Sequence, residues 1–153
     1  MKVLIDTNII VVLDFLLHRE PFRQDAEELF QAIDSGRIIG YVTATTLTDI
    51  FYIARRHTRS IEQARQAVLE TLTVMMVCPV NRTILEWAFA SGIGDFEDAI
   101  QIACAVTQGL EAILTRDRQG FLSSTNSACI LGSSAIGTIR HLRRLKSNVF
   151  LSH

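Results

Sequence analysis

The sequence predicts an α/β fold, a three-layer α/β/α sandwich with a mainly parallel central sheet covered by helices on both faces. Short apolar runs with β character alternate with helical stretches along the whole chain. The 153 residues, 48% of them hydrophobic, are enough for one domain with a substantial core. We therefore expect residues 1–153 to form a single domain without internal repeats or linkers.

The expected elements follow one another in a regular order. Apolar runs predict strands at 2–6, 37–43, 74–80, 111–115 and, more weakly, 127–131. Helical periodicity predicts helices over 9–18, 22–35, 46–57, 61–73, 82–91 and 96–108, with a basic helix over 134–146. Gly36 and Gly109 are placed to end helices, and Ser60 with Gln63 forms the pattern of a capping box.

The predicted helix that starts in DFEDAIQIACAV combines an acidic first turn with a largely apolar body. Ala99, Ile102 and Val106 fall on one helical face, and the other faces are mostly apolar too, so we expect the helix to be covered on more than one side. Acids in a first turn favour the positive end of the helix dipole, which explains Asp95. Asp98 instead points along the Ile102 stripe, where an ionised carboxylate needs a cation.

Acidic residues follow several of the predicted strands. In parallel sheets, ligands gather outside the carboxyl ends of the strands. Asp6, with Thr7 and Asn8, follows the first strand; Asp49 follows the second within one helical turn; Thr115 and Asp117 follow the fourth. Together with Asp95 and Asp98, these segments are expected to bring their carboxylates to one rim.

Such a cluster of carboxylates predicts a divalent metal site. Crowded carboxylates repel one another and raise one another's pKa unless a cation is present. Oxygen ligands without His or Cys favour Mg2+ or Mn2+, which lower the pKa of a bound water and neutralise charge on a phosphodiester. The predicted chemistry is therefore hydrolysis of phosphodiester bonds, with Thr7 and Asn8 orienting a metal-bound water or a ligand.

Four motifs, MKVLIDTN, TLTDIFYIARR, DFEDAIQIACA and ILTRD, occur in an order that resembles the PIN domain. This metal-dependent ribonuclease fold is common as the toxin half of bacterial toxin–antitoxin pairs of the VapC type. The resemblance covers the first four-fifths of the chain. It implies Mg2+ or Mn2+ as cofactor, RNA as substrate, an antitoxin as partner and a homodimer.

The resemblance also assigns site residues. It makes Asp6 the first metal ligand, Asp98 the third acid and Asp117 the fourth, so that Asp6, Asp98 and Asp117 hold the metal. Asp49 stands where the family often has Glu, and its shorter side chain changes the geometry of that ligand. Asp95 matches an additional acid of one branch of the family. The run after Asn8 is longer than usual, and the segment after Phe121 departs from the family pattern.

Simpler interpretations exist for several of these residues. Asp6 would also suit an N-cap, Asp49 a first-turn acid, Thr115 a strand end and Asp117 a turn. Three clusters of basic residues are each typical of a solvated face. We nevertheless expect Arg116 and Arg118, which flank Asp117, to contact the RNA backbone. Four aromatic residues at helical positions are expected to pack in the core rather than to stack on bases: Phe51, Tyr52, Trp87 and Phe96.

Composition excludes several classes of protein. The net charge of −1 gives no overall attraction for a polyanion, so nucleic acid must be met by local patches. The three cysteines, without CxxC spacing, indicate reduced core residues of a cytoplasmic protein and no zinc site. Charges bracket the apolar start, which argues against a signal peptide or membrane span.

Two other functions compete with the ribonuclease. A phosphatase of the haloacid-dehalogenase type also starts from an Asp after its first strand, but it needs a second Asp where this chain has Asn8. A PIN-like module that binds RNA or protein without cutting is the other alternative, suggested by Asp49 and the irregular tail. The retained acids argue against it, because a module freed from metal binding would gain stability by neutralising them.

Overall fold

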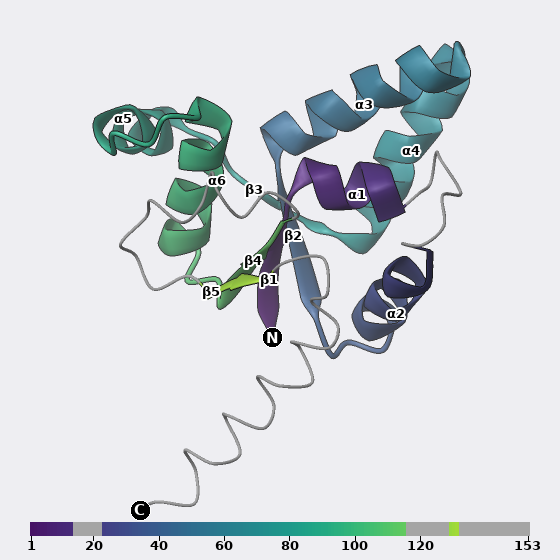
Figure 1. Cartoon of the computed structure of the whole chain (residues 1–153), viewed down its shortest axis with the longest axis horizontal. Coiled ribbons are helices and arrows are strands. Elements are labelled where there is room, and N and C mark those ends of the chain that lie inside the picture. The colour runs from purple at the N-terminus through teal and green to yellow at the C-terminus, as the bar shows by residue number, and fades with distance from the viewer. Residues whose placement is uncertain (14–22, 116–128, 132–153) are drawn as a thin grey trace, which may run out of the picture.

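A five-stranded parallel sheet forms the centre of the computed structural model, which describes residues 1–13, 23–115 and 129–131 (Figure 1). The strands are β1 (Lys2–Ile5), β2 (Ile39–Thr43), β3 (Met76–Cys78), β4 (Ala112–Leu114) and β5 (Cys129–Leu131). Their order in the sheet is β3-β2-β1-β4-β5, and all four pairings are parallel. The chain places β2 and β3 on one side of β1 and then places β4 and β5 on its other side. Ligands of such sheets bind at the carboxyl ends of the strands where the order changes sides, which here is the crevice between β1 and β4.

Helices cover both faces of this sheet. They are α1 (Thr7–Leu13), α2 (Arg23–Asp34), α3 (Ala44–Thr58), α4 (Ile61–Val74), α5 (Arg82–Ala90) and α6 (Phe96–Thr107). In Figure 1, α5 and α6 lie on one side of the strands, and α1 to α4 lie on the other. The expected α/β/α sandwich is confirmed, and the expected elements among the described residues are found with their ends shifted by a few residues.

Alternation along β1 builds the two hydrophobic cores. Val3 and Ile5 belong to the core beneath α1 to α4, whereas Leu4 belongs to the core beneath α5 and α6. All three side chains are at most 1% exposed. A strand buried on both faces reads as a continuous apolar run, which is why KVLI shows no alternation of polar residues.

Helix ends follow the local signals with one difference. Gly36 and Gly109 have φ angles of 69° and 60°, the left-handed conformation that glycine adopts without strain. Ser60 caps α4 by accepting from the Gln63 amide. The backbone amide of Ser60 donates to Thr58 Oγ1 rather than to Gln63, so only half of the expected capping box forms.

The prediction that the aromatic residues pack in the core was wrong for three of them. Tyr52 is 60% exposed, Trp87 38% and Phe96 49%. In α5 the buried stripe is Ile84 and Ala88, four residues apart, and Trp87 lies off that stripe. Because α5 has more apolar residues than its buried face can hold, the sequence alone does not show which of them are buried.

Two further sequence expectations fall in part or wholly outside the described residues. The predicted basic helix over 134–146 lies outside them, as does the segment around Asp117.

Among the helices that the structure describes, none has both the length and the apolar character needed to cross a membrane.

Candidate active site

Asp6 stands at the carboxyl end of β1, where the chain turns into α1. Its amide donates to the Leu114 carbonyl, and its carbonyl accepts from the amides of Ile9 and Ile10. The side chain is 5% exposed. Its Oδ1 accepts from Gln101 Nε2 at 3.0 Å and its Oδ2 from Thr115 Oγ1 at 2.7 Å. The carboxylate is therefore held from two sides by residues about a hundred positions away, which an ordinary helix cap does not require.

The end of β4 supplies the second part of the site. Thr115 is fully buried and donates its hydroxyl to Asp6. The same hydroxyl accepts from Asn8 Nδ2 at 3.2 Å. The structure thus brings together three of the predicted residues in the crevice between β1 and β4, with Thr115 linking Asn8 to the Asp6 carboxylate.

Gln101 and Glu97, on α6, were not predicted as site residues. Gln101 is 1% exposed, and its Nε2 donates to Glu97 Oε1 at 3.3 Å as well as to Asp6. Thr7 Oγ1 lies 3.4 Å from the same Glu97 oxygen. One buried amide therefore joins two carboxylates. The available signal was Gln101 itself, a lone polar residue in an apolar stretch one helical turn after Glu97.

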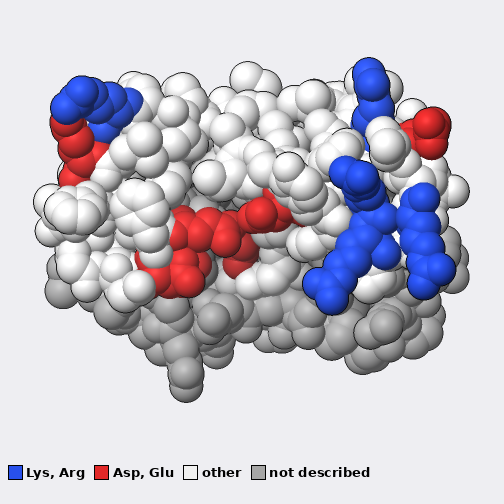
Figure 2. Space-filling model, turned by 90° about the horizontal axis from the view of Figure 1, so that it is seen from above, with Lys and Arg blue, Asp and Glu red and all other residues white. Residues whose placement is uncertain are grey.

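Three other acids lie near enough to Glu97 to affect the pKa of its carboxyl. Burial raises the pKa of the Glu97 carboxyl, and the negative charges of Asp49, Asp6 and Asp95 raise it further, against the opposing effect of the Gln101 hydrogen bond. Figure 2 shows the acidic side chains gathered in the middle of one face, in a hollow between the surrounding elements. Asp49 is thus close enough to act on this group, as expected for a residue of the first turns of α3.

The remaining acids at the start of α6 have different surroundings. Asp95 is the N-cap, and its Oδ1 accepts from the amides of Glu97 and Asp98 at 2.8 and 3.2 Å. This cap satisfies free amides of the first turn. Asp98 is half-buried, and Ile102, one turn along its face, is 1% exposed, so the stripe that Asp98 points along is buried.

The predicted metal ligands are not assembled into a complete site by the described residues. Asp117, with Arg116 and Arg118, lies outside them. Within the described part of the chain, no three His, Cys, Asp or Glu side chains are near enough together to hold an ion. Each Asp6 oxygen accepts one hydrogen bond, from Gln101 or from Thr115, and keeps a lone pair that could bind a cation.

The chemistry of the donors nevertheless fits a hard divalent cation. The groups that converge are carboxylate, hydroxyl and amide oxygens, which Mg2+ and Mn2+ prefer. The buried Gln101 Oε1 accepts no hydrogen bond from the described protein atoms. A cation near Glu97 would also offset the repulsion that raises the pKa of that carboxyl.

Comparisons with known structures give the same fold. The chain is similar to a chain of VapBC2 from Rickettsia felis, solved with a DNA fragment from their promoter: TM-score 0.63, 13% identity, 86% of this chain and 98% of that one. VapBC-1 from nontypeable Haemophilus influenzae gives TM-score 0.63, 19% identity, and coverage of 88% and 99%. A protein of Pyrobaculum aerophilum gives TM-score 0.59, 18% identity, and coverage of 94% and 90%. At these identities the likeness shows the fold.

Comparison with sequence families identifies the chain more closely. A search of curated proteins found no match. The family profile described as the PIN domain matches residues 2–119, which is more than half of the chain and includes every element from β1 to β4. The resemblance seen in the four sequence motifs is thus confirmed, and the chain belongs to the PIN domain family.

Proposed function

We propose that this chain is a metal-dependent endoribonuclease, the toxin of a toxin–antitoxin pair. One observation carries the proposal: Gln101 joins the Asp6 and Glu97 carboxylates, and Asp49 and Asp95 lie near enough to raise the pKa of Glu97. Carboxylates kept close together at the edge of a parallel sheet suit a site for a divalent cation. Membership of the PIN domain family supports the same reading.

In this proposal Asp6, Asp49 and Glu97 hold Mg2+ or Mn2+, together with the predicted ligands Asp98 and Asp117. When bound, the ion supplies a Lewis acid and a water of lowered pKa for attack on the phosphodiester. Gln101 fixes the orientation of Asp6 and Glu97, and Thr115 fixes Asp6 from the other side. Glu97, whose pKa is raised, holds its proton to a higher pH than usual, and it would have to give that proton to solvent in order to hold a cation.

The partners in this proposal are an RNA substrate, an antitoxin and a second copy of the chain. The likeness to chains of VapBC structures supports the antitoxin, which would cover the acidic face. The proposed site of action is the cytoplasm. A haloacid-dehalogenase-type phosphatase is not favoured, because Asn8, at the position of its second acid, donates an amide hydrogen to Thr115.

Calorimetric titration of the purified chain with Mn2+ tests the metal site. We expect saturable binding that Asp6→Asn abolishes and that Glu86→Gln, which removes an exposed acid of α5, leaves unchanged. A parallel assay measures cleavage of a labelled single-stranded RNA in Mn2+ by the same three proteins. The Asp6→Asn protein should not cut, whereas the Glu86→Gln protein should cut like the parent.

A second candidate, the binding module without catalysis, is favoured by one observation. The described acids are not grouped closely enough to hold an ion as they stand. If the folded protein takes up no Mn2+ at millimolar concentration, either alone or in the presence of RNA, the nuclease proposal fails and the binding module replaces it. Including RNA matters because magnesium-type sites often need substrate phosphate to fill.

A further inference from the structure

One face of α3 carries an acid, an exposed aromatic ring and two cations in succession. Asp49, Tyr52, Arg56 and Arg59 follow one another at intervals of three, four and three residues, so they line one side of the helix or its immediate end. We call these four residues the α3 stripe. At the helical rise, it extends about 15 Å from the acidic site toward the far end of the molecule.

The acidic end of the α3 stripe lies at the candidate active site. Asp49 acts on the pKa of Glu97, which places it beside the acidic patch. Figure 2 shows this patch in the middle of one face and a group of Lys and Arg side chains toward one end of the same face. The cations of the α3–α4 hairpin are Arg55, Arg56, Arg59 and Arg65, and all four are exposed.

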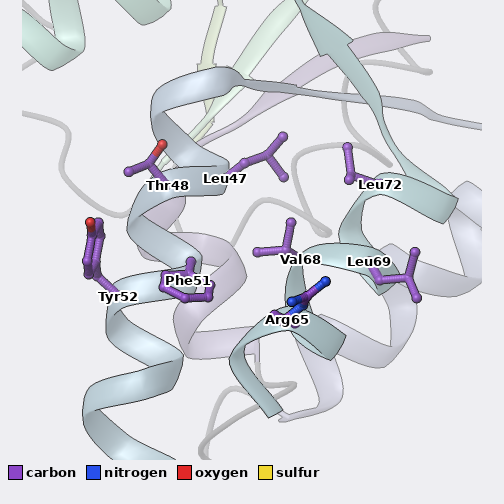
Figure 3. Close-up of a pocket in the computed structure, with 8 residues that line it drawn as sticks. All are labelled: Leu47, Thr48, Phe51, Tyr52, Arg65, Val68, Leu69 and Leu72. Carbon is purple, nitrogen blue, oxygen red and sulfur yellow. The ribbon is translucent and has the colours of Figure 1, made fainter. Parts of the chain in front are cut away.

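Tyr52, between the two ends, offers a ring to solvent. It is 60% exposed, and its orientation is supported by an edge-to-face contact with Phe51, at a centroid distance of 5.5 Å. In Figure 3, Tyr52 projects from α3 on the side away from α4, whereas Leu47 projects toward α4. Tyr52 is also among the residues that line the groove between these helices. The ring is thus held by one neighbour and open on the side away from the helix pair.

The cations are not accounted for by structural needs alone. The α3 dipole favours Arg55 and Arg56 in the last turn. It does not explain Arg65, which lies in the first turns of α4, where the dipole favours acids. Arg59, the C-cap of α3, lies at the same negative end, but its φ of 56° would suit glycine better, so an arginine there carries a backbone cost. None of the four forms an ion pair with another described residue, although Arg65 influences the nearby Glu62.

We propose that the α3 stripe binds the single-stranded RNA that leads away from the scissile phosphate. This inference rests on the proposed nuclease function. Tyr52 would stack on one base, and Arg56 and Arg59 would contact backbone phosphates. An aromatic platform followed by a row of cations is the combination that binds single strands with little sequence preference. It also explains how a chain with a net charge of −1 meets a polyanion beside an acidic patch.

Fluorescence anisotropy with a labelled single-stranded RNA of roughly 12 nucleotides, a length within the usual range of single-strand sites, tests the proposal. The inactive Asp6→Asn protein in Mg2+ is the parent for every variant. Tyr52→Leu should weaken binding about tenfold without altering its salt dependence, since stacking involves no counterion. Arg56→Gln and Arg59→Gly should each reduce the slope of log affinity against log salt by about 0.7.

Two features of the design separate binding from folding. Arg59→Gly relieves the left-handed residue, so its melting temperature should be equal to or above that of the parent while its RNA affinity falls. Arg37→Gln is the matched control, because it removes one exposed cation just before the amino end of β2. The candidate active site lies at the carboxyl ends of the strands. The RNA affinity and salt slope of Arg37→Gln should match those of the parent.

The same substitutions in the active protein distinguish this inference from the nuclease proposal. RNA binding that is absent from the parent, or unchanged in all three stripe variants, would overturn the stripe, even if the wild type cuts RNA. Reduced binding in a protein that never cuts would support the stripe and reject the nuclease. The same anisotropy assay is repeated with labelled polyglutamate. If the substitutions abolish binding to polyglutamate but leave RNA binding unchanged, the surface binds an acidic protein partner and the proposal is overturned.

Discussion

Replacing Glu97 by Gln removes one negative charge from the acidic patch with little change in shape. Both hydrogen bonds that reach this carboxylate, from Thr7 Oγ1 and Gln101 Nε2, end on Oε1. An amide oxygen can accept both of them. The substitution therefore tests the electrostatic effect of the neighbouring carboxylates rather than a loss of contacts.

The expected gain in the metal-free protein follows from the surroundings of Glu97. Burial and the charges of Asp49, Asp6 and Asp95 all disfavour its ionised form, and only the Gln101 hydrogen bond favours it. Because the side chain is only half-buried, solvent screens each of these charges, and a pair of this kind contributes about 0.2–1 kcal/mol. We expect Glu97→Gln to raise the free energy of unfolding by about 1 kcal/mol, which for a chain of this length is a rise of about 2–4 °C in melting temperature.

The stability that Glu97→Gln gains over the wild type should increase as the pH rises. The raised pKa means that the folded state binds more protons than the unfolded state above the ordinary value of 4.5, so wild-type stability falls as pH rises through this window. Gln does not titrate. The difference between the two proteins should therefore be fully present above the raised pKa and disappear below about pH 4, where Glu is protonated in both states.

Thermal unfolding in EDTA at pH 8 and at pH 3.5 measures this difference. Glu86→Gln is the control, because Glu86 is an exposed acid that pairs with Arg82 at 2.7 Å. That variant should be slightly less stable than the wild type, or unchanged. A lower melting temperature for Glu97→Gln at pH 8, or a gain that persists unchanged at pH 3.5, would refute the electrostatic reasoning.

Three further predictions concern buried groups. Gln101→Leu should lower the melting temperature by roughly 2–10 °C in thermal unfolding, because the Asp6 and Glu97 carboxylates lose a shared donor at a cost of about 1–3 kcal/mol. Thr115→Val should destabilise by a similar amount in urea titration, whereas Thr115→Ser, which keeps the hydroxyl at Asp6, should cost less. Burial raises the pKa of Cys78 to about 12 and of Cys104 to about 11. In a Cys129→Ser background at pH 8, iodoacetamide should therefore modify neither thiol until the protein is unfolded, and rapid labelling of the folded protein would contradict the burial of these groups.

The fold could be predicted because its signals are local. Runs such as KVLI and the amphipathic helices require only neighbouring residues to be recognised, and the right-handed alternation of strand and helix then leaves few arrangements. The same reasoning predicted that Asp6 and Thr115, which each end a strand, lie at one edge of the sheet. The order of the strands was not predicted, and the hydrogen bond between these two residues, 109 positions apart, depends on β1 and β4 being neighbours.

The roles of Glu97 and Gln101 could not be predicted in the same way. An acid in the first turn of a helix has a sufficient local explanation in the helix dipole, so nothing in the sequence pointed Glu97 toward Asp6. Which side of α6 faces β1 depends on how the helix packs, because that helix is apolar on nearly all sides. The same difficulty explains Trp87, whose helix has more apolar residues than its buried face can hold.

Three acids of the patch, Asp6 at the end of β1 and Asp95 and Glu97 at the start of α6, differ in how their charges are compensated. Asp95 accepts from two main-chain amides at the positive end of the helix. Asp6 accepts a short hydrogen bond from Thr115 and a second bond from Gln101. Glu97 receives only two long hydrogen bonds, both on one oxygen, and three carboxylates act against its ionisation. Of these three acids, Glu97 is therefore the one whose charge the described residues compensate least. A divalent ion bound beside Glu97 would offset the repulsion from these carboxylates, so we propose Glu97 as a participant in metal binding beside Asp98, the acid of this helix that the family resemblance assigned.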